Sequence, residues 1–221
     1  MIVSRANLDD ARTVAELEAW IGARPDSTPF HRPAWISAVA RGTGQEAMML
    51  VCRHGGGDIA GVLPLNLIHS PLFGRALVSS GFAVDGGILA DDAAVAEALA
   101  QEFWRLAQVL SCPTAELRGG ALPREGWTLK SGVYLNFAKA LEADDDAQLL
   151  AIPRKHRAEV RKGLDNGLDM EFGRDQRLLD IHYRLYAENV HRLGTPVFPK
   201  AMFAEVLATF GADADIALVS K

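Results

Sequence analysis

The sequence predicts an α/β protein in which helices flank a mixed sheet, and in which the element order starts a second time. Two observations lead to this prediction. Segments with strand periodicity alternate with segments of helical periodicity over residues 1–141. The order strand, helix, helix, strand then begins again and breaks off at residue 221. We therefore expect one repeat at 1–141 and the incomplete start of a second at 142–221.

The composition is that of an ordinary soluble protein, with 221 residues of which 49% are hydrophobic and 23% charged. No apolar run reaches the roughly 20 residues of a membrane span, and the N-terminus does not resemble a secretion signal. Cys52 and Cys112 lack metal-ligand spacing and lie among apolar residues, which favours buried thiols over a disulfide. We expect a cytoplasmic protein, either free in the cytoplasm or attached peripherally to the inner face of the membrane.

The elements of the first repeat follow from periodicity and from capping residues. Expected helices follow Asp9 or Asp10, Pro33, and Asp91 or Asp92. Val95, Leu99 and Phe103 mark the apolar face of the third helix. The expected strands cover 2–5, 47–53, 59–68, 115–118 and 133–137, with an extended pair at 75–79 and 86–89.

The second repeat is expected to hold helices at 144–152, 154–164, 178–192 and 199–210, and strands at 170–172 and 216–219. An offset of 168 residues places Phe30 on Phe198, Trp35 on Phe203 and Leu50 on Leu218. By this alignment the second copy lacks a counterpart of 54–141, so we expect a truncated form of a longer two-domain protein. An unpaired strand at 216–219 would favour self-association.

One basic segment contradicts the acidic average of the chain. The whole protein carries a formal net charge of -5, whereas residues 154–162 hold five Lys or Arg and one Glu, a sum of 5 - 1 = +4. At helical spacing, Arg154, Arg157 and Arg161 share one side, with Lys155 and Lys162 beside them. Such a patch indicates an anion site. The alternative is a solvated face in which Glu159 and Asp165 pair with these cations, each pair contributing about 0–1 kcal/mol.

Three motif runs resemble one known family. They are Thr28-Pro29-Phe30-His31-Arg32-Pro33-Ala34-Trp35; Pro153-Arg154-Lys155-His156-Arg157 with Val160-Arg161-Lys162 and Gly167; and Tyr183-Arg184-Leu185-Tyr186 with Arg192-Leu193-Gly194-Thr195-Pro196-Val197-Phe198-Pro199. Together with the element order, they resemble the Fem-type (FemAB-like) transferases of the GNAT acyltransferase superfamily. The exosortase or exopolysaccharide-associated branch is the most similar one. The resemblance covers nearly the whole chain and implies a tandem GNAT-like fold whose second copy is incomplete.

The resemblance implies an acyltransferase or aminoacyltransferase that modifies an amine on a peptidoglycan or other cell-surface polysaccharide precursor. By position, Arg154, Arg157, Arg161 and Lys162 would meet the acceptor's phosphates, and Arg41 would reach them from the first copy. The residues that would line a groove between the copies are Tyr183, Tyr186, Arg192 and Phe198. The catalytic base stays unassigned, with His191 and Tyr186 as its candidates.

The implied partner is a phosphate-bearing small molecule or a lipid-linked acceptor. The acyl donor of the full-length protein would be acyl-CoA or aminoacyl-tRNA. The donor-binding strand and helix of a GNAT domain would lie beyond Lys221, so we expect no cofactor bound by this chain and an inactive fragment. No metal site is expected, because His182 and His191 do not have ligand spacing.

Two alternatives assign no chemistry to the chain. The basic helix would bind RNA, such as a tRNA acceptor stem, or it would dock on the inner membrane surface.

For other polar residues, a structural role is favoured over a catalytic one. His31 is interpreted as a capping or packing residue before the Trp35 helix. Ser80 and Asp85 do not follow a known triad order, so a serine hydrolase is not favoured.

Overall fold

The computed structural model describes residues 1–72, 74–123, 126–132, 135 and 137–221. The chain divides into two compact units. The first contains Met1–Trp127 and Leu185–Ala214, and the second contains Thr128–Arg184 and Asp215–Lys221. This division differs from the expected boundary after residue 141, because the segment Leu185–Ala214 packs with the first unit. The strand expected at 133–137 falls largely on residues 133, 134 and 136, which lie outside the described residues.

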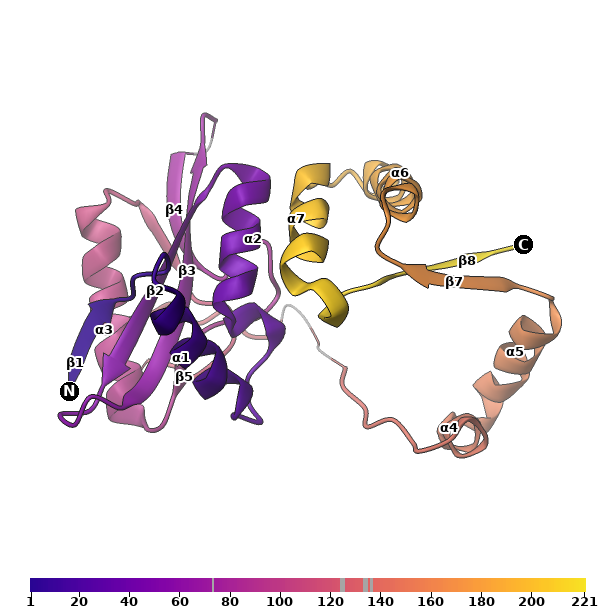
Figure 1. The fold of residues 1–221 in the computed structure, drawn as a ribbon, viewed down its shortest axis with the longest axis horizontal. Coiled ribbons are helices and arrows are strands. Elements are labelled where there is room, and N and C mark those ends of the chain that lie inside the picture. The colour runs from indigo at the N-terminus through magenta and orange to yellow at the C-terminus, as the bar shows by residue number, and fades with distance from the viewer. Residues whose placement is uncertain (73, 124–125, 133–134, 136) are drawn as a thin grey trace. The chain divides into compact units, whose positions relative to one another are not determined.

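The first unit forms most of the elements that periodicity and capping predicted, together with two short 3-10 helices that were not expected (Figure 1). They are β1 (Ile2–Arg5), α1 (Ala11–Gly22), η1 (Pro29–His31), α2 (Pro33–Thr43), β2 (Glu46–Arg53), β3 (Ile59–Ser70), β4 (Gly74–Ser79), β5 (Leu89–Ala90), α3 (Ala93–Val109), β6 (Thr114–Glu116), α7 (Lys200–Phe210) and η2 (Gly211–Asp213). Helix α6 (Gln176–Arg192) runs from the second unit into the first. The side chains of Asp10 and Asp92 cap α1 and α3.

The sheet of the first unit is mixed, with strand order β1-β2-β3-β4-β6. Neighbours along this order are antiparallel except β4 and β6, which are parallel. The expected strand at 75–79 is confirmed as β4, whereas the expected strand at 86–89 is reduced to β5 at Leu89–Ala90, and both strands pair with β3 instead of with each other. The chain between them, residues 80–88, is therefore free to form a loop at the end of β4.

The core lies on both faces of this sheet. Along β2, Met48, Leu50 and Cys52 face one buried cluster, which includes Phe103 of α3. Residues Met49 and Val51 face the other cluster, built with Leu17 and Ile21 of α1 and Ile36 of α2. Because side chains alternate along a strand, a strand buried on both faces must be apolar throughout. Helices thus cover each face, as Figure 1 shows for α3 on one side and α1 with α2 on the other.

Helix α7 packs closely against α2 within the first unit. A Cβ atom added at Gly42 would collide with the Met202 backbone, so glycine is needed for this approach. The Arg41 guanidinium donates to Glu205 Oε2 at 2.7 Å and to Thr209 Oγ1 at 2.5 Å, and the Trp35 and Phe210 rings lie 6.5 Å apart. Gly42 and Phe210 occupy equivalent positions at the offset of 168. Gly42 contacts Met202 at the start of α7, and Phe210 contacts Trp35 at the start of α2. A two-fold relation between the two helices would give this reciprocal pattern.

The second unit contains α4 (Asp145–Ala151), α5 (Arg154–Asp165), β7 (Asp169–Gly173), the first half of α6 and β8 (Ile216–Ser220). The expectation of an unpaired C-terminal strand is wrong, because β8 pairs antiparallel with β7 from Asp169↔Ser220 to Gly173↔Ile216. Self-association stays a prediction. Met170, Phe172 and Val219 are exposed on one face of this ribbon. Neither α4 nor α5 contains a buried residue.

Candidate functional site

The basic helix α5 has clear local start and stop signals. Pro153 takes the N-cap position with φ -52° and ψ 137°, so the helix begins at Arg154. Asn166 is the C-cap, and Gly167 follows with φ 62°, a left-handed conformation that glycine adopts without strain. The helix is therefore defined by its own sequence, since it buries no residue.

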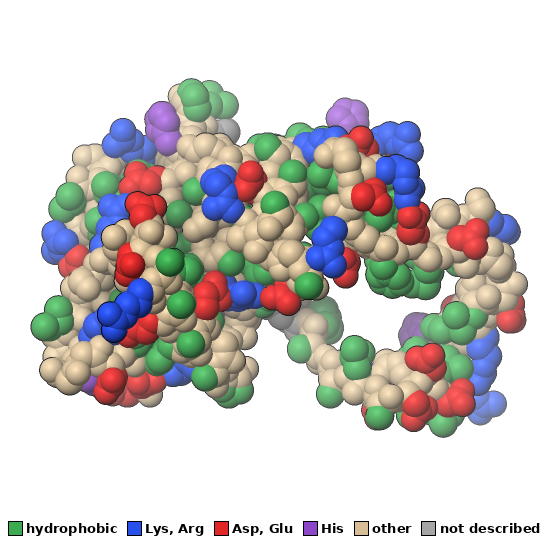
Figure 2. Space-filling model, in the orientation of Figure 1, with side chains coloured by type: hydrophobic (Ala, Val, Ile, Leu, Met, Phe, Trp, Pro, Cys, Tyr) green, Lys and Arg blue, Asp and Glu red, His purple; other side chains and the backbone are tan. Residues whose placement is uncertain are grey.

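The described residues provide no carboxylate partner for the cations of α5. Among the described residues, none of the five Lys and Arg side chains of α5 forms an ion pair, and neither Glu159 nor Asp165 pairs with them. Arginines elsewhere behave differently: Arg24, Arg32 and Arg53 each lie within 3.1 Å of a carboxylate oxygen. Figure 2 shows Lys and Arg side chains gathered along the segment that Figure 1 labels α5. The local ion pairs of the alternative interpretation are thus absent among the described residues, whereas Arg154, Lys155, Arg161 and Lys162 are exposed, as a solvated face requires.

Arg157 differs from the other cations of α5. It is half-buried, and its Nε atom is shielded from solvent with no hydrogen-bond partner in the described part of the chain. A buried donor without an acceptor costs about 1–3 kcal/mol. An acceptor oxygen bonded to Nε would remove this cost.

The acidic residues before α5 have a separate role. Asp145 and Asp146 lie in the first turn of α4, where carboxylates interact favourably with the helix N-terminus. The Asp144 side chain accepts the Ala147 N–H at 2.8 Å as the N-cap. These three carboxylates therefore stabilise α4, and the described residues contain no ion pair between them and α5.

Tyr186 and Phe198, two of the residues expected to line a groove, come together in the first unit. The Phe198 N–H donates to the Tyr186 hydroxyl at 3.1 Å. The Phe198 ring lies 5.0 Å from Phe82, and the Tyr186 ring lies 5.0 Å from Phe203. This aromatic cluster joins the segment before α7 to the loop that follows β4. Two further candidates of the first unit, His191 and Arg192, are exposed in the last turn of α6.

Arg41 and Tyr183 lie in different units. The Arg41 guanidinium is engaged by Glu205 and Thr209 of α7, so within the first unit it contributes to helix packing. Tyr183 is half-buried on the part of α6 that belongs to the second unit. The structure thus groups Arg154, Arg157, Arg161, Lys162 and Tyr183 in one unit and the other candidates in the other.

The loop after β4 was not singled out as a site by the sequence. Ser80 has φ 48° and Phe82 has φ 60°, left-handed values that cost non-glycine residues about 1–3 kcal/mol. The Ser80 hydroxyl donates to the Phe30 carbonyl at 2.7 Å, and Trp35 Nε1 donates to the Gly81 carbonyl at 3.1 Å. The signal available in the sequence was the repeated glycine at 81, 86 and 87.

His31 caps η1, as the sequence indicated, and it is buried beneath this loop. Its exposed fraction is 2%, and its Nδ1 accepts the Thr28 N–H at 3.0 Å. Burial lowers the pKa of His31, because it disfavours the imidazolium.

Burial also raises the pKa of Cys52, which is a free thiol like Cys112. The described residues contain no group of three or more His, Cys, Asp or Glu suited to a metal ion.

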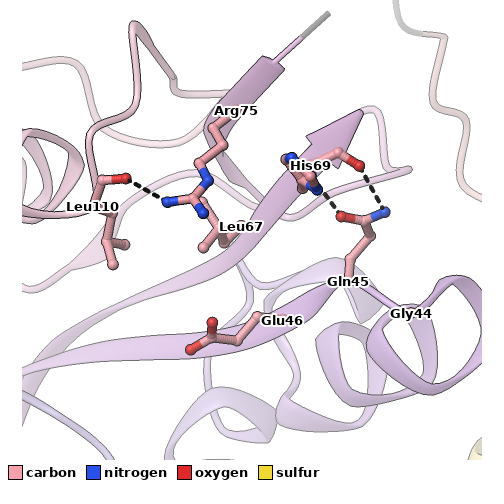
Figure 3. Close-up of a pocket in the computed structure, with 7 residues that line it drawn as sticks. All are labelled: Gly44, Gln45, Glu46, Leu67, His69, Arg75 and Leu110. Carbon is pink, nitrogen blue, oxygen red and sulfur yellow. Dashed lines mark hydrogen bonds between the residues drawn. The ribbon is translucent and has the colours of Figure 1, made fainter. Parts of the chain in front are cut away.

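A shallow hollow of about 360 Å³ lies at the end of β2, β3 and β4 (Figure 3). Its polar groups are used by the protein itself. Gln45 exchanges hydrogen bonds with the His69 backbone, Glu46 pairs with Arg5, and Arg75 donates to the Leu110 carbonyl at the end of α3. These contacts support the sheet edge and leave Gln45, Glu46 and Arg75 engaged by the protein itself.

The element order and the mixed sheet flanked by helices define an α/β fold. Among solved structures, FemX is similar to this chain with a TM-score of 0.63 and 16% identity, over 99% of this chain. The chain spans 57% of the length of FemX. At this identity the similarity establishes the fold.

A second similar structure is a ribosomal-protein-alanine N-acetyltransferase from Brucella melitensis biovar Abortus 2308. Its TM-score is 0.39 at 20% identity, over 62% of this chain and 100% of that chain, which is too low to support an argument. No protein-family model and no curated protein matches the sequence. Within the described residues, no helix has the length and apolar character needed to cross a membrane.

Proposed function

We propose that this chain is part of an N-acyl or aminoacyl transferase whose helix α5 binds the phosphates of its acceptor. The acceptor would be a cell-wall or cell-surface polysaccharide precursor that carries an amine. The observation that supports the phosphate site is the set of five Lys and Arg side chains on α5 without an ion pair among the described residues. The reaction class is supported by the fold shared with FemX and by the motif resemblance to Fem-type transferases.

The chemistry of the cations fits a diphosphate. Guanidinium groups bind phosphate oxygens through paired N–H donors, and such charge-assisted bonds are about twice as strong as neutral ones. Arg154, Arg157 and Arg161 repeat at helical spacing, so neighbouring phosphates can be contacted by successive turns. Arg157 Nε already lacks an acceptor, which favours this position for the first contact.

The proposed reaction joins the acceptor amine to the carbonyl carbon of an activated donor ester. The C–N bond forms, the bond from the carbonyl carbon to the donor oxygen or sulfur breaks, and the amine loses a proton. A donor such as acyl-CoA or aminoacyl-tRNA would serve the full-length protein. Tyr186 already accepts the Phe198 N–H, and His191 is exposed, so neither is assigned as the base. The role of α5 is to hold the acceptor.

Binding of RNA by α5 is the competing proposal. Nucleic-acid sites combine cations with aromatic side chains that stack on bases. The segment Arg154–Asp165 contains no Phe, Tyr or Trp. A nucleotide sugar is therefore favoured over RNA as the occupant. Residence in the cytoplasm, at the inner membrane face for a lipid-linked acceptor, belongs to this proposal.

The test compares binding of UDP-N-acetylglucosamine, coenzyme A and tRNA by calorimetry. Arg157→Ala/Arg161→Ala should weaken nucleotide-sugar binding at least about tenfold, since two charged contacts are lost. Arg157→Lys/Arg161→Lys should give an intermediate affinity, because the charge remains and the paired donors are lost.

The matched control is Arg12→Ala/Arg105→Ala, which removes the same charge from exposed helix positions of the first unit. It should bind like the unchanged protein. Equal nucleotide-sugar binding by the α5 variant and the unchanged protein would remove α5 from the site. Tight tRNA binding that falls steeply with salt and is lost in the α5 variant would instead support the RNA proposal.

A further inference from the structure

Strand β8 is paired along one of its two edges. It runs antiparallel to β7, and among the described residues no other strand pairs with it (Figure 1). The strand, Ile216–Ser220, contains no proline, glycine or charged residue, the types that commonly protect an edge from pairing. Strand β7 is different, because Asp169 and Glu171 place two carboxylates along it. The second edge of β8 is therefore a surface to which another strand can be added.

One face of the β7–β8 ribbon is apolar and exposed. Residues directly opposite each other in an antiparallel pair share a face. Met170 lies opposite Val219, and Phe172 lies opposite Ala217. All four side chains are exposed. A two-stranded ribbon is marginally stable in water, whereas a sheet of three or more strands with an apolar face is independently stable. Pairing with a strand that continues this face would therefore stabilise the ribbon.

The sequence of β8 is suited to pairing with a second copy of itself. In an antiparallel pair with a two-fold axis at Leu218, all 5 residues of the strand have a partner. The opposed pairs are Leu218 with Leu218, Ile216 with Ser220, and Ala217 with Val219. The axis stands perpendicular to the sheet, so the apolar face of one copy continues into that of the other.

The residues that flank β8 are complementary in charge in this register. Asp215 of one copy comes opposite Lys221 of the other, once at each end of the contact. Opposite charges directly across an antiparallel pair stabilise it, and like charges destabilise it. Asp215 also pairs with Arg174 of its own copy at 3.4 Å, and a carboxylate has two oxygens that can accept from two cations. Charge and register therefore favour a second copy of this chain over an unrelated strand.

We propose that two copies of this chain associate through β8, with the two strands antiparallel and a two-fold axis at Leu218. The contact joins two 2-stranded ribbons into one sheet with the order β7-β8-β8-β7. It lies within the second unit and uses no cation of α5. The association is therefore independent of the proposed phosphate site, and failure of one leaves the other intact.

Sedimentation velocity of the full chain at increasing protein concentration tests the association, and we expect a monomer–dimer equilibrium. Ala217→Lys/Val219→Lys places like charges opposite each other on both sides of the axis and should weaken dimerisation at least about tenfold. Ala217→Glu/Val219→Lys should restore it, because each introduced carboxylate then comes opposite an introduced ammonium group. Both positions are exposed, so circular dichroism should show the same fold in the two variants.

The matched control is Met170→Lys/Phe172→Lys, which adds the same charge to the same face on β7, away from the proposed contact. It should weaken dimerisation less than Ala217→Lys/Val219→Lys does. Equal weakening by these two variants would place the contact on the apolar face and overturn pairing at the edge. Dimers that Ala217→Glu/Val219→Lys does not restore would overturn the register. A chain that stays monomeric up to its highest soluble concentration would overturn the whole proposal.

Discussion

Helices α3 and α5 share local signals but differ in what supports them. Helix α3 buries Leu99, Phe103 and Ala107 against the sheet, whereas α5 buries none of its 12 residues. Isolated helices of this length are marginal in water, so most helix stability in proteins comes from packing. The cations of α5 therefore contribute little to the fold as described. A helix that does not stabilise its unit is free to carry charges selected for binding.

The largest predicted change in the free energy of unfolding comes from a substitution in the core beneath α3. Phe103→Ala should lower the free energy of unfolding by about 3–5 kcal/mol, because a fully buried ring is replaced by a cavity. Val160→Ala on α5 should change it by less than about 0.5 kcal/mol. Urea denaturation followed by circular dichroism measures both. Similar losses in the two variants would show that α5 is packed in solution.

Two glycines provide a second test of the contrast between a helix packed in the first unit and the exposed helix α5. Gly42→Ala should lower the free energy of unfolding by about 1–3 kcal/mol, because its Cβ would meet the Met202 backbone. Gly163→Ala on α5 is the matched control, since nothing lies within 4 Å of its added Cβ. It should raise helix stability by about 0.5–1 kcal/mol. A harmless Gly42→Ala substitution would contradict the close packing of α2 on α7.

The smallest predicted effect is the dependence of the free energy of unfolding on pH. Folding lowers the pKa of His31 from its ordinary value of 6.5, mainly through burial, against the attraction of Asp85 and Asp26. The unfolded chain then binds more protons between the two pKa values. The stabilising contribution is complete above pH 6.5 and is lost as the pH falls through the folded pKa. Denaturation at several pH values should show this slope, and His31→Asn should abolish it. An identical slope in that variant would assign it to other groups.

Periodicity and caps predicted most elements correctly, because their signals are local. Asp10 and Asp92 cap the helices that they were expected to start. Strand partners cannot be predicted from local signals, because pairing depends on residues that are far apart in the sequence. The partner of β8 is β7, more than 40 residues earlier, and nothing in the sequence of either strand specifies the other.

The candidate site could also be predicted only in part from the sequence. The charges of α5 could be identified from the sequence, whereas their lack of ion pairs depends on what surrounds the helix. Arg41 was assigned to the phosphates by position, yet its partner within the first unit is Glu205, 164 residues away. The left-handed Ser80 and Phe82 have no local turn signature, because tertiary contacts such as the Ser80 bond to Phe30 impose their conformation.

The pairing of α2 with α7 has a consequence for how such a chain could arise. Arg41 and Thr209, which bond to each other, are 168 residues apart, and this separation equals the offset at which the sequence predicts two copies to align. In a dimer of identical subunits, that contact would set arginine against arginine, and the positions of Gly42 and Phe210 would have to be both glycine or both phenylalanine. Covalent duplication removes this constraint. It lets one copy supply the small residue and the hydrogen-bond donor while the other supplies the ring and the acceptor, and the linkage keeps the two at high effective concentration.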